Sequence, residues 1–307
     1  MNLFRMADAT TGAGGMAPHA FGAVVRAFVP APVRRMKGRF DPNARVLGRL
    51  GTLEVRLARS RDEVKAAQRL RYHVFYEEMS AKPSMLQKVT RRDKDGFDRY
   101  CDHLLVVDTS RGGALSEQIV GTYRLMVPEG AAMAGRYYTE QEFQITPMIA
   151  RHPGKRFMEL GRSCVLKPYR GKRTVELLWQ GIMAYVRLHR IDVLFGCASL
   201  SGTDPETLAL PLSFLRSNAS APIEWQVPAQ PHRGLPQNGD VVCADPRRAL
   251  ASLPPLLKGY LRIGGYIGGD AVVDTQFGTT DVLVVVPVAN IDPRYIEYYG
   301  PDSRFAA

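Results

Sequence analysis

The most restrictive feature of the sequence is an alternation of strand-like and helix-like segments that begins at residue 52. Residues 52–58 alternate in the manner of a strand, and residues 60–79 follow with apolar side chains at helical spacing. The order of the later segments predicts an α/β domain with a mixed sheet. Further predicted strands are residues 103–108, 119–128, 156–166, 191–200 and 281–288, and further predicted helices are residues 174–189, 204–217 and 253–265.

Two other features support this organisation. Ser60 and Glu63 have the spacing of a capping box at the start of the first helix. Residues 218–245 are rich in Pro, Gly and Asn, which predicts a long loop.

The N-terminal residues differ from the rest of the chain. Residues 1–45 combine a Gly- and Ala-rich stretch with a basic, partly apolar one, whereas residues 46–300 form the expected catalytic domain. The first segment fits either a disordered basic tail or a segment that lies on an anionic bilayer. Pro30 and Pro32 exclude a long helix there.

The charge of the chain predicts an anionic partner. Its formal net charge is +11 and its pI is about 9.6, which fits nucleic acid, an anionic membrane surface or an acidic protein. The four cysteines show no paired spacing, so we expect reduced thiols and no metal site. Because no apolar run is long enough to span a bilayer and no secretory signal is evident, we expect a cytoplasmic protein.

A basic loop between a predicted strand and a predicted helix forms the first candidate site. Positively charged side chains are normally unfavourable at a helix N-terminus, because the unpaired N–H groups make that end of the helix positive. The clustering therefore favours a bound anion, such as the phosphate of a carrier, over a solvated basic loop. The loop matches neither the Walker A nor the GxGxxG pattern. Its residues are Lys167, Arg170, Gly171, Lys172 and Arg173.

Buried or clustered carboxylates form two more candidate sites. Glu159 lies in an otherwise apolar strand, where it fits equally a structural ion pair with Arg162 or Arg124 and a general base. Asp95 and Asp98, with Asp93 and Asp102, could bind a cationic substrate. From the residues alone, a solvated charged loop is the simpler interpretation of that acidic cluster.

Two local patterns do not support catalysis. His103 and Asp108 match an HxxxxD acyltransferase pattern, but strand residues five apart point to opposite faces. Cys164 has no local His to activate it, so we expect a buried strand cysteine.

Seven segments keep one order between about residues 50 and 300: "QRLRYHVFYEEM", "DKDGFD", "DHLLVVD", "VGTYRLM", "MELGRSCVLKPYRGKRT", "LFGCASLSGTDPE" and "LKGYLRIGGYIGGDAVVDTQFGTTDVLVVV". As a set they resemble the bacterial L-ornithine Nα-acyltransferases, which make lyso-ornithine lipid from ornithine and a 3-hydroxyacyl-acyl carrier protein. That family is similar in fold to GCN5-related N-acetyltransferases and acyl-homoserine lactone synthases. The resemblance implies a mostly antiparallel central sheet flanked by helices, with a C-terminal extension.

The resemblance also implies residue roles. A cleft that binds the substrate would be lined at the positions of Arg71, Phe75, Asp95, Asp98, Arg124, Glu159 and Arg162. The acetyltransferase pyrophosphate loop has the pattern [Q/R]xxGx[G/A], and here only Gly171 of that pattern is kept. The departure favours the phosphopantetheine of an acyl carrier protein over free coenzyme A as the donor.

The expected reaction is direct acyl transfer without an acyl-enzyme and without a bound cofactor. Glu159 would take a proton from the ornithine α-amine, and N–H groups near Ser163 would stabilise the oxyanion, with Arg162 beside them. We expect an acyl carrier protein and ornithine as partners, peripheral contact with the inner face of the cytoplasmic membrane, and no nucleic acid. The alternatives are a lactone synthase, a coenzyme A-dependent N-acyltransferase and a non-enzymatic binder of anionic surfaces.

Overall fold

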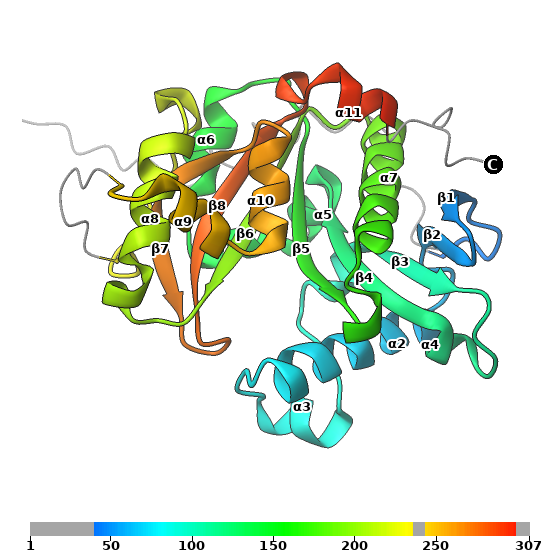
Figure 1. Cartoon of the computed structure of the whole chain (residues 1–307). Helices are drawn as coiled ribbons and strands as arrows, with labels where there is room; N and C mark the ends of the chain where they lie inside the picture. The colour runs from blue at the N-terminus through cyan, green and yellow to red at the C-terminus, as the bar shows by residue number, and fades with distance from the viewer. Residues whose placement is uncertain (1–39, 236–242, 299–307) are drawn as a thin grey trace, which may run out of the picture. The chain divides into compact units, whose positions relative to one another are not determined.

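The strand-like runs of the sequence form one eight-stranded sheet (Figure 1). The computed structural model describes residues 40–235 and 243–298. The strands pair in the order β1-β2-β3-β4-β5-β6-β8-β7, and every neighbouring pair is antiparallel except β5 and β6. This confirms the mixed, mostly antiparallel sheet. The strands are β1 (Val46–Leu50), β2 (Leu53–Leu57), β3 (Asp102–Asp108), β4 (Ile119–Met126), β5 (Phe157–Val165), β6 (Val193–Ser201), β7 (Tyr266–Asp274) and β8 (Thr279–Pro287).

Helices and single helical turns connect these strands. The α-helices are α2 (Arg61–Tyr72), α3 (Met85–Thr90), α4 (Leu115–Gln118), α5 (Pro128–Ala134), α6 (Ile145–Arg151), α7 (Lys172–His189), α8 (Pro205–Ala219), α9 (Pro246–Ser252), α10 (Pro255–Arg262) and α11 (Pro293–Tyr298). The other turns are the π-helix η2 (His73–Glu78) and the 3₁₀ turns η3 (Asp98–Tyr100), η4 (Tyr138–Gln141), η5 (Lys167–Tyr169), η6 (Ile223–Trp225) and η7 (Val288–Asn290).

Alternate side chains of β3 show that different helices cover the two faces of the sheet. Leu104 and Val106 pack in the same cluster as the apolar face of α7. Leu105 and Val107 pack in another cluster with Leu70 and other residues of α2. Because successive strand residues point to opposite faces, α7 and α2 lie on opposite sides of the sheet. Figure 1 shows α7 and α10 on the same side.

The sheet divides between β5 and β6. These strands pair in parallel only from Phe157 to Glu159 on β5 and from Val193 to Phe195 on β6. Beyond that point, β5 stays paired with β4 and β6 with β8. The second halves of β5 and β6 therefore face a gap in the middle of the sheet.

Several elements differ from the sequence prediction. The first helix ends at Tyr72 and continues as a π-helix, and the helix at residues 205–219 is long despite Pro211. The strands β1 and β7 were not predicted. Three glycines between residues 265 and 269 hide the strand pattern of β7, whose register also shifts between Ile267 and Ala271. In the predicted loop at residues 218–245, α8 extends to Ala219, and the other described residues are irregular apart from η6 and isolated bridges to β7 and to Phe143.

The predicted basic segment at residues 1–45 lies, except for residues 40–45, outside the described part of the chain. The catalytic-domain boundary near residue 46 therefore stays a prediction. Among the described helices, none combines the length and the apolar character that a bilayer-spanning helix needs.

Candidate active site

A cavity of about 530 Å³ occupies the gap between β5 and β6. Residues 160–165 line it from β5, and residues 197–199 line it from β6. Because the two strands do not pair here, their backbone and side chains are open to a bound molecule instead of to each other. The cavity is therefore the candidate active site.

One end of the cavity is apolar. Leu178, Trp179 and Ile182 of α7 line it, together with Leu256 and Gly259 of α10. These residues form a wall suited to a hydrocarbon chain.

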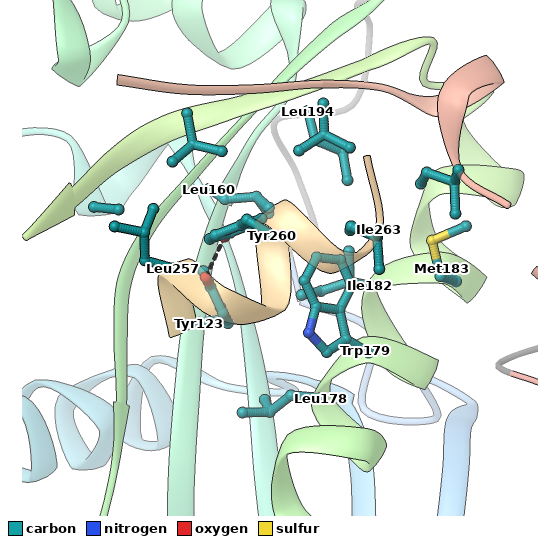
Figure 2. Close-up of a cluster of buried hydrophobic side chains, with 14 of the residues drawn as sticks. Tyr123, Leu160, Leu178, Trp179, Ile182, Met183, Leu194, Leu257, Tyr260 and Ile263 are labelled. Atoms are coloured by element: carbon teal, nitrogen blue, oxygen red, sulfur yellow. Dashed lines mark hydrogen bonds between the residues drawn. The ribbon is translucent and has the colours of Figure 1, made fainter. Parts of the chain in front are cut away.

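The contact of α10 with the sheet fixes this wall. Tyr260 of α10 and Tyr123 of β4 share a hydrogen bond of 2.6 Å, and the ring of Tyr260 packs edge-on against Trp179 (Figure 2). Leu257 lies in the same cluster. The C-terminal extension therefore completes the apolar end of the cavity.

The other end of the cavity holds a buried carboxylate. Glu159 accepts hydrogen bonds from the backbone N–H groups of Tyr138 and Thr139 at 2.9 and 2.6 Å, and from the Thr139 hydroxyl. Burial raises the pKa of Glu159, and these donors oppose the rise. Within the described residues Glu159 makes no ion pair, which disfavours the alternative of a structural pair with Arg162 or Arg124, although the charge of Arg124 helps to lower the pKa of Glu159.

A β-bulge lies next to Glu159. Thr122 pairs with Cys164 and Arg124 pairs with Gly161, so Arg162 and Ser163 together face the single residue Tyr123. Arg162 has a φ of 51°, which lies in the left-handed region. A bulge leaves one residue outside the hydrogen-bond ladder and often lies beside an active site. Both bulge residues line the cavity.

Arg71 is fully buried behind the cavity wall. Its Nε lies 2.9 Å from Asp93 Oδ2, and its two terminal nitrogens each lie 3.0 Å from an oxygen of Asp98. Gln68 and Tyr76 donate further hydrogen bonds to Asp98 and Asp93. The acidic cluster is therefore buried and paired, which corrects the interpretation of a solvated loop.

Arg124 and Arg162 extend this network to the cavity. Arg124 lies 2.6 Å from Asp95 and 3.3 Å from Asp98, and Arg162 lies 3.2 Å from Asp93 and 3.4 Å from Asp95. The positive charges of three arginines thus balance the negative charges of three aspartates in this network. Asp95 and Asp98 pair with these arginines and are not among the residues that line the cavity.

The charges of the network fix its ionisation. Burial opposes ionisation of Asp98, but the charge and hydrogen bonds of Arg71 outweigh it and hold the pKa of Asp98 far below its usual range. Burial likewise opposes ionisation of Asp95, and the charges of Arg124 and Arg162 lower its pKa.

The structure brings six of the predicted site residues to the cavity. Its lining includes Phe75, Arg124, Glu159, Arg162, Ser163 and Arg170. Phe75 packs edge-on against Phe277, which also lines the cavity. Arg71, Asp95 and Asp98 lie behind the wall, and Lys167, Gly171, Lys172 and Arg173 lie outside it.

The basic loop lies next to the cavity and is exposed. Arg170 lines the cavity and pairs with Glu78, whereas Lys172 has 86% of its side chain exposed and lies 3.4 Å from Glu176. Gly171 is the N-cap of α7, without a side-chain cap, and has open space where a Cβ would be. The first turn of α7 is therefore accessible to an anion.

Sequence reasoning missed the residues that hold Glu159. Tyr138 and Thr139 belong to η4, which lies about 20 residues earlier in the chain, and no motif marks them. Tyr138 also accepts a hydrogen bond from Arg162 at 3.2 Å. His103 and Asp108 bond to different partners, Asp98 and Tyr169, and Cys164 is a buried residue of β5 that also lines the cavity.

Residues 70–180 match the family described as an acetyltransferase (GNAT) domain. The chain is also 53% identical over 270 residues to a protein named L-ornithine N(alpha)-acyltransferase from Rhizobium meliloti, a match that covers 87% of this chain and 90% of the relative. The chain belongs to the L-ornithine Nα-acyltransferase family. It is an acyltransferase.

A more distant member of the L-ornithine Nα-acyltransferase family supports the same conclusion. The Rhodobacter capsulatus protein of that name is 38% identical over 249 residues, which cover 80% of this chain and 94% of the relative. Family membership excludes the non-enzymatic binder. A solved lactone synthase, MesI, described as CoA-dependent, is 13% identical with a TM-score of 0.41, and the match covers 78% of this chain and 86% of that chain.

Proposed function

We propose that the protein transfers a 3-hydroxyacyl chain from the thioester of an acyl carrier protein to the α-amine of L-ornithine, giving lyso-ornithine lipid. The observation that carries the proposal is the cavity itself, which joins an apolar end to a buried carboxylate. The names of the relatives supply the acceptor.

Glu159 is the proposed general base. An α-ammonium group has a pKa of about 8, so it must lose a proton before its nitrogen can attack. Burial favours the protonated form of Glu159, and three donors stabilise its charged form. A carboxylate poised in this way is suited to accept a proton from a nearby amine.

The bond changes follow from direct attack. The amine nitrogen forms a C–N bond to the thioester carbonyl carbon, and the C–S bond breaks. The first amine proton goes to Glu159, and the second leaves with the thiolate as a free thiol. We propose that the bulge at Arg162 and Ser163 stabilises the oxyanion of the tetrahedral intermediate, because a bulge leaves an N–H group outside the hydrogen-bond ladder.

The acceptor would lie against Arg124 and Arg162 in the cavity wall. Arg162 and Arg124 offer guanidinium groups to its carboxylate, and Phe75 covers it. Arg71, Asp95 and Asp98 are positioning residues in this proposal, because they hold the two lining arginines from behind.

The donor would enter past the start of α7. Lys167, Arg170, Lys172 and Arg173, with the open backbone at Gly171, form a basic rim for the phosphopantetheine phosphate and the acidic carrier. No resident cofactor is needed, since the thioester is a co-substrate. We further propose a cytoplasmic enzyme in peripheral contact with the inner membrane face, because the product is a lipid and the chain carries a charge of +11.

Mass spectrometry of lipids from a host that makes no ornithine lipid tests the proposal. The wild-type gene should give a new species with the mass of ornithine plus a hydroxy fatty acid minus water. Glu159→Gln should lower the rate of transfer by about 10²- to 10⁴-fold in the purified enzyme, since it removes the base. The exposed control Glu224→Gln should leave the rate unchanged.

Three outcomes would contradict parts of the proposal. Lipids with another amino acid head group would keep the chemistry and change the acceptor. Lactone formed from S-adenosylmethionine would favour a lactone synthase. Full activity in a folded Glu159→Gln protein, checked by thermal unfolding, would exclude Glu159 as the base.

A further inference from the structure

An acidic group lies on the side of the cavity opposite β5, and one of its carboxylates, Asp281, lines the cavity. Asp281 of β8 lies across from Ser199 of β6, and Cys197 points to the same face as Ser199. These three residues line the cavity. Glu142, directly after η4, completes the group, since single ligand atoms of Glu142, Cys197 and Asp281 all lie within 4.8 Å of one another.

Glu142 has an unused acceptor in this group. Glu142 is only 5% exposed, its buried Oε2 has no donor at good hydrogen-bond geometry among the described residues, and the weakly donating thiol of Cys197 interacts with its carboxyl group. Its other oxygen lies 3.7 Å from Arg233, which is too long for a strong ion pair. A buried carboxylate oxygen without a donor is costly unless something outside the chain supplies one.

The surroundings disfavour the charged forms of both carboxyl groups. Burial, and then the charge of Asp281, raise the pKa of Glu142 to about 7. Burial also raises the pKa of Asp281, although Ser199 and Thr279 donate hydrogen bonds to it. A cation between them would supply the missing donors and allow both groups to ionise.

This acidic group is connected to Glu159. Thr139 donates its hydroxyl to Glu159 and lies 3.7 Å from the sulfur of Cys197. The two acidic positions therefore share the polar end of one cavity, on two sides of Thr139. A molecule with two amino groups could place one at each position.

We propose that Glu142 and Asp281 bind the side-chain ammonium of the acceptor, and so select a diamino acid over an amino acid with an apolar side chain. The inference rests on the proposed function, in which Glu159 receives the α-amine. An ammonium group has three donors, which suits the free oxygen of Glu142 and the carboxylate of Asp281.

The test compares two acceptors with purified full-length protein. L-Ornithine and L-norvaline share one carbon chain, and only ornithine has the side-chain ammonium. The wild type should prefer ornithine in kcat/KM by at least about tenfold, the size of one charged hydrogen bond. Glu142→Gln and Asp281→Asn should each bring the ratio close to one, mainly through a higher KM for ornithine, with norvaline turnover retained. Glu224→Gln should keep the wild-type ratio.

Four other results would contradict either the proposed function or this inference. A wild type that acylates neither acceptor would overturn the proposed function itself. A wild type that prefers ornithine, with both variants unchanged in ratio, would overturn only this inference. Loss of norvaline turnover in folded variants would assign the two residues to the chemistry. Stoichiometric metal in the purified enzyme, with activity removed by a chelator, would establish a metal site instead.

Discussion

At the scale of the residue, the arginines and aspartates decide where charge can be buried. Arg71 is among the largest side chains that are fully enclosed in the described structure. Its charge is tolerated because Asp93 and Asp98 surround it. The same aspartates reach Arg162 and Arg124, so the pairing that allows burial also orients two side chains of the active site.

Asp98→Asn should destabilise the protein by about 3–5 kcal/mol, because it leaves Arg71 and Arg124 buried with less compensation. Chemical denaturation at pH 7 measures the free energy of unfolding. The exposed variant Asp62→Asn, which removes a surface pair with Lys65, should leave that free energy unchanged. A small effect of Asp98→Asn would show that the network does not stabilise the fold.

The effect of Asp98→Asn on the free energy of unfolding should depend on pH. The pKa of Asp98 is lowered in the folded protein, so its contribution is fully present above the unfolded pKa of about 4 and is lost as pH falls below it. The difference in stability between wild type and Asp98→Asn should therefore shrink below about pH 4. A difference that stays constant between pH 5 and pH 3 would contradict this ionisation.

At the scale of the element, α10 sets the size of the apolar end. It is anchored by Tyr260 to Tyr123 and to Trp179 (Figure 2). Its Gly259 lines the cavity. A Cβ on Gly259 would meet nothing within 4 Å. The space beside this glycine is therefore open to the acyl chain and to a larger side chain.

Gly259→Leu should shorten the acyl chains that the enzyme transfers. The added side chain would fill space that methylene groups of the acyl chain occupy. One methylene group in an apolar pocket is worth about tenfold or more in kcat/KM. Lipid mass spectrometry should show a shift to shorter chains. Gly259→Ala should keep the wild-type profile and stabilise the helix by about 1 kcal/mol. An unchanged profile in the Leu variant would place the acyl chain elsewhere.

At the scale of the whole molecule, the charge of +11 favours approach of an acidic partner. The exposed cations at the start of α7 lie beside the cavity, where a carrier protein would have to deliver its thioester. Salt screens exposed charges, so the donor should bind more weakly as ionic strength rises.

The double variant Lys172→Glu/Arg173→Glu should raise the KM for acyl carrier protein by about tenfold and reduce its salt dependence. Steady-state kinetics at several salt concentrations measure both effects, and the KM for ornithine should not change. Arg247→Glu/Arg248→Glu on α9 is the matched control, because these exposed cations do not line the cavity. Equal effects of the two double variants would indicate attraction by net charge alone.

The sequence by itself determined the main strands and helices, because their apolar periodicity is local. It also marked Glu159 as unusual, since a carboxylate in an apolar strand needs a partner wherever the strand lies. It did not reveal β7, whose glycines carry no apolar pattern, or the π-helix, which shares the periodicity of the helix before it.

Only the tertiary structure decided which charges meet. Glu142, Cys197 and Asp281 are far apart in the chain, and no local pattern brings the three together. The donors of Glu159 come from η4, and the partners of Arg71 come from residues 93–98. Such contacts depend on the pairing of distant strands and on the gap between β5 and β6, which local periodicity cannot specify.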